Sequence, residues 1–83
     1  MTYTVLAYFD KDVEKFNPAM FFPMQSEFAI ENIKDAVIKG KIEGAEAFDL
    51  YLLGSYDTAN GLFNLNEKPV KVATLSDYVK ESA

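Results

Sequence analysis

The chain has 83 residues, of which 49% are hydrophobic and 14% aromatic, and its formal net charge is -5. This length suits one hydrophobic core, so we expect residues 1–83 to form a single domain, and the apolar content excludes a disordered chain. Cysteine is absent, which excludes a disulfide framework and a thiolate metal site and favours a reducing compartment.

Histidine, tryptophan and arginine are also absent, so all eight basic residues are lysines. Without histidine or cysteine the usual general base and the usual transition-metal ligands are missing. We therefore expect no enzymatic activity and no cofactor, and a small hydrolase is disfavoured. Without arginine, bidentate contacts to guanine edges or phosphates are unavailable.

No apolar run approaches the ~20 residues of a membrane span, and residues 1–3 lack the basic start of a secretory signal. We expect no membrane partner and a cytoplasmic location. The acidic net charge favours solubility and disfavours unspecific attraction to phosphate.

The first half of the chain predicts two strands and a helix. Residues 2–9 are apolar on both alternating faces, which indicates a central strand. After a charged turn, residues 16–22 predict a strand that lies at an edge or is interrupted at Pro18, because proline cannot donate to a ladder. Ser26 is the expected N-cap of a helix that ends before Gly40. The buried stripe of this helix comprises Ala29, Ile30, Ile33, Ala36 and Val37.

The second half predicts a hairpin, a short strand and a helical turn. Residues 49–56 form a second apolar strand, residues 57–61 carry turn chemistry, and residues 62–65 return antiparallel. Residues 70–74 alternate well enough for a short strand, and Ser76 begins a terminal helical turn. The sequence therefore predicts an α+β fold, in which one antiparallel sheet of about four to five strands carries the long helix on one face.

The apolar strands carry more hydrophobic surface than this helix can cover. Residues 2–9 and 49–56 are apolar on both sides, whereas a single helix covers only one face of a sheet. Large exposed apolar patches usually mark interfaces. We therefore expect a homodimer that forms through the uncovered sheet face.

Several short motifs, taken in order, resemble one family of viral proteins. The clearest is the segment from Leu50 to Asp57, which ends in Leu-Gly-Ser-Tyr-Asp and is followed by Gly61 and Phe63. Residues 69–72, Pro-Val-Lys-Val, follow in the expected place. The N-terminal half adds Tyr-Phe-Asp at residues 8–10, together with Phe16, the Pro18 region, Phe21, Phe22, Ser26 and Ala29. With these motifs, nearly the whole chain resembles the small non-structural proteins of gokushovirus-type microviruses, which are tailless phages with circular single-stranded DNA genomes.

The resemblance implies a DNA-binding phage protein. Its expected role is to bind single-stranded viral DNA and to help shift replication from duplex synthesis to single-strand synthesis for packaging. It also implies action in the cytoplasm of the bacterial host rather than a role as a major capsid component. The net charge of -5 and the absence of arginine depart from what is typical of DNA-binding proteins.

A single-strand binder needs aromatic rings beside lysines, because bases stack on rings while ammonium groups hold the backbone. The predicted nucleic-acid-binding residues are Tyr8, Tyr51, Tyr56, Lys39, Lys41, Lys68 and Lys71. Tyr51 lies on the strand face opposite Leu50 and Leu52, whereas Phe63 is expected in the core. The alternative interpretation is that these tyrosines are half-buried with their hydroxyls in water.

The carboxylates form two groupings without a clear site. Asp10, Asp12 and Glu14 alternate like the start of a calcium loop, but the required glycine and terminal glutamate are missing, and they are expected to neutralise Lys11 and Lys15. A second grouping, in which no acid–base pair is implied, comprises Glu43, Glu46 and Asp49.

Two functions therefore remain open. The first is a non-enzymatic phage protein that binds single-stranded DNA. The second is an acidic protein-interaction module that acts on a host or viral replication protein without touching nucleic acid.

Overall fold

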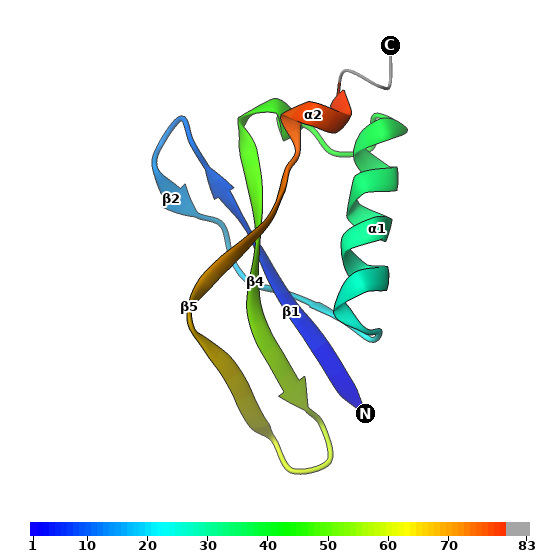
Figure 1. Ribbon diagram of the computed structural model, residues 1–83, viewed down its shortest axis with the longest axis vertical. Helices are drawn as coiled ribbons and strands as arrows, with labels where there is room; N and C mark the ends of the chain where they lie inside the picture. The colour runs from blue at the N-terminus through cyan, green and yellow to red at the C-terminus, as the bar shows by residue number, and fades with distance from the viewer. Residues whose placement is uncertain (80–83) are drawn as a thin grey trace.

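The structure is a computed structural model that describes residues 1–79, and it shows one sheet with a helix on one side (Figure 1). The elements are β1 (Thr2–Asp10), β2 (Lys15–Phe16), β3 (Met20–Phe22), α1 (Ser26–Ile38), the 3-10 turn η1 (Ala45–Ala47), β4 (Phe48–Asp57), β5 (Leu62–Thr74) and α2 (Ser76–Val79). The predicted α+β class is confirmed, with its antiparallel sheet, single long helix and short C-terminal helix.

The sheet is antiparallel with the order β2-β1-β4-β5, and β3 pairs with β1 on the same side as β2. β1 is the central strand that its two apolar faces predicted. The chain leaves the β1 ladder between Phe16 and Met20, where Pro18 removes a donor, so the predicted interruption is present.

The helix α1 begins one residue earlier than expected. Gln25, not Ser26, occupies the extended N-cap position, and it makes no side-chain capping bond. At the other end Gly40 has a φ of 71°, its N–H donates to Val37 O, and the Lys41 N–H donates to Ala36 O. This is a Schellman ending with glycine at C′, as predicted.

In residues 1–79, no helix combines the length and apolarity that a membrane crossing needs.

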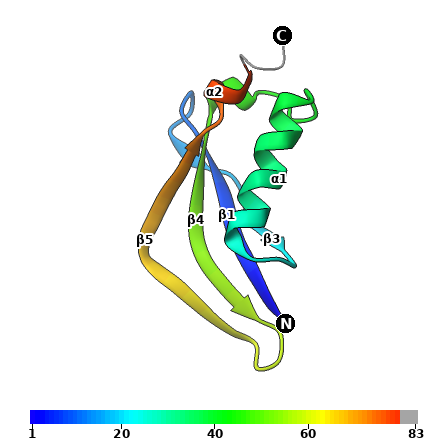
Figure 2. The same ribbon diagram turned by 45° about the vertical axis from the view of Figure 1, so that its right-hand side comes forward.

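The hydrophobic core lies between α1 and one face of the sheet (Figure 2). Leu6, Leu50 and Leu75 are fully buried there, and α1 contributes Ala29, Ile33 and Val37. The other two members of the predicted stripe, Ile30 and Ala36, are only partly buried. At one end of the core, the rings of Tyr8 and Phe48 stack with centroids 5.1 Å apart.

The segment after the hairpin differs from the expectation of two short strands, because residues 62–74 form the single strand β5. Its pairing with β4 is irregular: Gly54 pairs with Leu65 and Leu52 with Val70, so residues 66–69 lie opposite Leu53 alone. The Asn66 side chain donates to Leu52 O over 3.1 Å in this stretch. The interruption expected at residues 66–69 is therefore a bulge within one strand, which is where proline is tolerated.

Gly54 sits at this irregularity and approaches β5 closely. Its φ is 147°, and a Cβ atom there would lie 2.3 Å from Asn64 O and 2.7 Å from Leu65 Cα. Both neighbours are backbone atoms, which cannot move without separating the strands. The glycine of the Leu-Gly-Ser-Tyr-Asp motif therefore has a structural reason.

We predict that Gly54→Ala lowers the free energy of unfolding by about 3–5 kcal/mol, because it adds a backbone clash to an unfavourable φ. Gly61→Ala is the matched control, since Gly61 has a φ of 72° but open space around it, and we expect a loss of about 1 kcal/mol. Urea denaturation of both variants measures the difference. Equal losses would contradict the close approach of β4 and β5.

Candidate nucleic-acid interface

Among residues 1–79, no helix or strand covers the second face of the sheet, which we call the open face (Figure 2). Leu6 and Tyr8 of β1 point to the helix-side core, so alternation places Tyr3, Val5 and Phe9 on the open face. Residues paired across strands share a face. The strand register therefore places on the open face the residues of β2, β3 and β4 that pair with this side of β1, and the residues of β5 that pair with those of β4. These residues are Phe16, Phe21, Asp49, Tyr51, Gly54, Tyr56, Phe63, Leu65 and Lys71.

The aromatic side chains of the open face form two groups of three rings. The Phe9 cluster comprises Phe9, Phe16 and Tyr51, with centroid distances of 5.0, 6.1 and 5.2 Å. The Tyr56 cluster comprises Phe21, Tyr56 and Phe63, with distances of 4.7, 5.9 and 6.1 Å. Tyr51 and Tyr56 are separated along β4 by roughly 15 Å, given ~3.3 Å per residue.

The rings of both clusters are partly exposed. Phe16 and Phe21 are each 45% exposed, and Phe63 is 53% exposed. The expectation that Phe63 belongs to the core is therefore wrong, because β5 is an edge strand and α1 lies on the other face. Val5 and Ala7 are buried between the clusters although no described helix or strand lies over them, so the surrounding side chains shield them.

A buried carboxylate lies beside the Phe9 cluster. Asp49 pairs with Phe9 in the ladder, and its side chain is only 9% exposed. Lys11 Nζ lies 3.6 Å from Asp49 Oδ1, and Lys71 Nζ lies 3.4 Å from Oδ2. Asp49 Oδ1 accepts no hydrogen bond. The two lysines, which are about half exposed, thus approach one carboxylate from either side of β4.

This ion-pair cluster contains more positive than negative groups although the chain is acidic. The two ammonium groups and one carboxylate sum to +1, against -5 for the whole chain. Lys11 was expected to be neutralised by the acids of its own turn, but its ion pair is with Asp49. The signal in the sequence was Asp49 itself, a charged residue within an apolar strand, because buried charges are nearly always paired.

The predicted site residues separate into two groups. Tyr51, Tyr56 and Lys71 lie on the open face. Tyr8 does not join them, because it points to the helix side, where burial raises the pKa of its hydroxyl above the usual tyrosine value.

The other predicted lysines also lie apart from the clusters. Lys39 and Lys41 follow α1 on the opposite layer, and Lys39 Nζ pairs with Asp35 Oδ2 at 2.8 Å. Lys68 is exposed in the bulge of β5. Sequence reasoning placed Lys11 in a solvated turn and left it out of the predicted nucleic-acid-binding residues.

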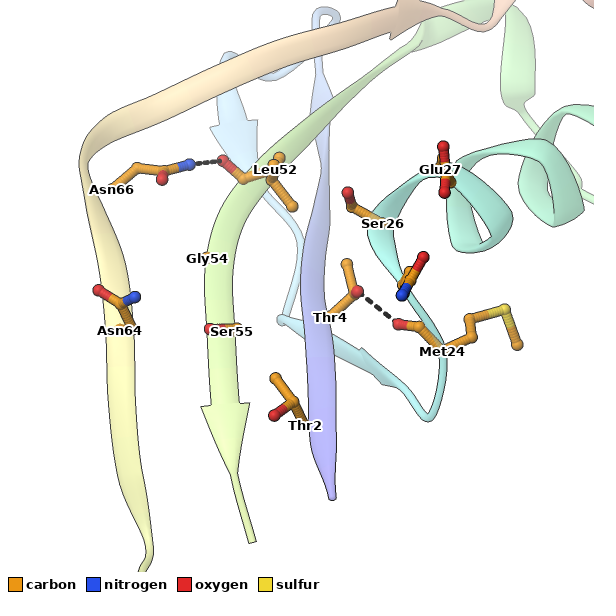
Figure 3. Close-up of a pocket in the computed structure, with 11 residues that line it drawn as sticks. Thr2, Thr4, Met24, Ser26, Glu27, Leu52, Gly54, Ser55, Asn64 and Asn66 are labelled. Carbon is orange, nitrogen blue, oxygen red and sulfur yellow. Dashed lines mark hydrogen bonds between the residues drawn. The ribbon is translucent and has the colours of Figure 1, made fainter.

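A polar cleft of about 590 Å³ lies on the helix side, between the start of α1 and the β4–β5 hairpin (Figure 3). Its polar side chains include Thr2, Ser26, Ser55, Asn64 and Asn66. Glu27 is the one titratable residue of its lining. Within the described residues, no group of three or more His, Cys, Asp or Glu side chains is placed to hold a metal ion.

Comparison with known proteins identifies a family. No curated protein and no solved structure shows significant similarity to the chain. The family model described as Phage ORF5 protein matches residues 3–78, which include the whole of α1 and every strand residue except Thr2. The chain therefore belongs to the Phage ORF5 protein family.

Proposed function

We propose that this phage protein is not an enzyme and that it binds single-stranded DNA on the open face of its sheet, with little base specificity. In the host cytoplasm, such binding would help to shift viral replication from duplex to single-strand synthesis. The observation that carries the proposal is the presence of two partly exposed ring clusters on one sheet face, one of which lies beside the converging Lys11 and Lys71.

The rings support single-stranded rather than double-stranded DNA. Unpaired bases expose their flat surfaces, and stacking on an aromatic side chain contributes about 1–3 kcal/mol per base. Every base has such a surface, so recognition by Tyr51 and Tyr56 depends little on sequence. The absence of arginine agrees with weak base readout, since arginine makes the commonest specific contact to guanine.

The local charge supports an anionic ligand on this face. Lys11 and Lys71 lie at the edge of the Phe9 cluster, where a backbone phosphate would lie if a base stacked on Tyr51. Many of the acidic side chains lie elsewhere, including Glu27, Glu31 and Asp35 on α1. Asp10, Asp12 and Glu14 lie in or next to the turn of Lys11, so the proposal depends on direct contacts of Lys11 and Lys71 with phosphate and not on long-range attraction.

We predict that Tyr51→Ala and Tyr56→Ala each weaken binding of a fluorescent oligothymidylate by about 5- to 150-fold, which corresponds to the loss of one stacked base. Phe28→Ala is the matched control, because Phe28 is 57% exposed but lies on α1, and we expect no change in its affinity. Fluorescence anisotropy measures the dissociation constants, and circular dichroism checks that each variant is folded.

The same titration over a series of salt concentrations tests the electrostatic part. For single strands, the slope of log affinity against log salt is about -0.7 for each phosphate neutralised. Undetectable binding at ~50 mM salt would remove the proposal.

A protein partner is the second candidate for the open face. Exposed apolar side chains on one face, including Phe16, Phe21, Phe63 and Leu65, are typical of interfaces. The partner would be a second copy of this chain or a replication protein. A homodimer through this face would cover both ring clusters, so self-association and DNA binding would compete.

We predict that the protein sediments as a dimer at high micromolar concentration and that added oligothymidylate shifts it towards a DNA-bound monomer. Phe63→Ala should weaken the dimer because it removes an exposed ring from the interface, whereas Phe28→Ala should not. Analytical ultracentrifugation separates the species. A chain that stays monomeric throughout would remove the dimer, and a dimer that binds DNA without dissociating would place the two sites on different surfaces.

A further inference from the structure

Asp49 is an unusual residue for the middle of a sheet. It lies between the buried Leu50 and the 3-10 turn before β4, and its side chain is 9% exposed. Burial of a carboxylate is unfavourable unless it is paired and hydrogen-bonded. Asp49 Oδ1 has no hydrogen-bond partner, so the carboxylate depends on Lys11 and Lys71 for its compensation.

Neither lysine needs Asp49 as a partner, because each ammonium group can be hydrated by solvent. The Lys11 and Lys71 side chains are 41% and 47% exposed, and their Nζ atoms lie 3.6 and 3.4 Å from the carboxylate. These are longer than the 2.7–2.9 Å typical of a strong charged hydrogen bond. Both ammonium groups can therefore leave the carboxylate by rotation of their flexible side chains, without movement of the backbone.

Two ammonium groups that bind the two oxygens of one carboxylate can also bind the two free oxygens of a phosphodiester. A backbone phosphate carries a single negative charge and offers two free oxygens, as a carboxylate does. Lys11 follows β1 and Lys71 lies on β5, so the two approach from opposite sides of β4. Their common position is beside the Phe9 cluster, where Lys71 pairs with Tyr51 in the ladder.

We propose that Lys11 and Lys71 form a phosphate-binding site for single-stranded DNA and that Asp49 occupies this site as an internal counter-ion in the free protein. This rests on the proposed function and adds its electrostatic mechanism. A DNA phosphate binds by drawing the two lysines away from Asp49, so the carboxylate is a competitor that lowers the affinity. Affinity is thereby kept low although the rings and lysines are already in place.

The test is Asp49→Asn, which keeps the shape of the side chain and removes its charge. Binding of a fluorescent oligothymidylate of about 16 nucleotides should tighten by roughly 2- to 30-fold at ~50 mM salt, the effect of no longer breaking two ion pairs whose lysines are about half exposed. Asp35→Asn is the matched control, because it also removes one negative charge and frees one lysine, but on α1. Its effect should be less than about 2-fold, since only distant, screened charge changes.

A double-mutant cycle isolates the lysines. In a Lys11→Ala, Lys71→Ala background the added Asp49→Asn should have no effect on affinity, because no phosphate site remains to be freed. Tightening that persists in this background, or an equal gain from Asp35→Asn, would overturn the inference and assign the effect to net charge. Weaker or unchanged binding by Asp49→Asn would also overturn it.

A measurement on the unmodified protein removes any dependence on variant folding. In a titration with the same oligothymidylate, the side-chain carboxyl resonance of Asp49 should shift in NMR spectra as its lysines leave, while that of Asp35 stays in place. If Tyr51→Ala weakens binding but the Asp49 resonance of the unmodified protein does not move during the titration, the inference is overturned and the proposed function is kept. Absence of any oligonucleotide binding would instead remove the proposed function itself.

Discussion

Leu6 of β1 and Leu50 of β4 pack against α1 and have no exposed surface. Their orientation determines which face of the sheet each remaining side chain of these two strands points to. Side chains alternate along a strand, so fixing these two leucines towards the helix sends Ala7 and Tyr51 the other way. The chain supplies no second helix or sheet for that side among the described residues (Figure 2). The open face is protected instead by its own rings, which shield Val5 and Ala7 but remain partly exposed themselves.

The open face is the more available docking surface, because the edge of the sheet is poorly suited to adding a strand. β5 ends the sheet order and most of it is exposed, which normally makes an edge a template for pairing. In β5, however, residues 66–69 bulge away from regular pairing with β4, and they include Pro69. Bulges and edge prolines are devices that discourage edge-to-edge association. The proposed ligand or second copy would therefore meet the face of the sheet and not this edge.

The distribution of charge matters more for this protein than its sum. A net charge of -5 is a property of the whole surface, whereas binding depends on groups within about one Debye length, ~8 Å at physiological salt. Beside the Phe9 cluster, Lys11 and Lys71 place two ammonium groups around the single carboxylate of Asp49. Pairing with Lys11 and Lys71 also explains how the carboxylate of Asp49 can be buried, which the local sequence pattern does not explain.

Much of the fold was predictable because its signals are local. The two-sided apolar character of residues 2–9 predicted the central strand, Gly40 predicted the end of α1, and Pro18 predicted the break between β2 and β3. The cap at Gln25 and the continuous β5 were not predicted. Helix starts shift by a residue with little cost when no side chain caps them, and a bulge within a strand resembles a loop in sequence.

The candidate site was only partly predictable. Strand alternation correctly placed Tyr51 on the face opposite Leu50. Residue type alone, however, grouped Tyr8 and Lys39 with Tyr51, and Phe63 was assigned to the core. By itself the sequence determined the fold class, the apolar excess of the central strands and the lack of the usual catalytic side chains. Only the tertiary structure decided which rings share a face and that Lys11 and Lys71 meet at Asp49, because those contacts join residues far apart in the chain through the pairing of β4 with β1 and β5.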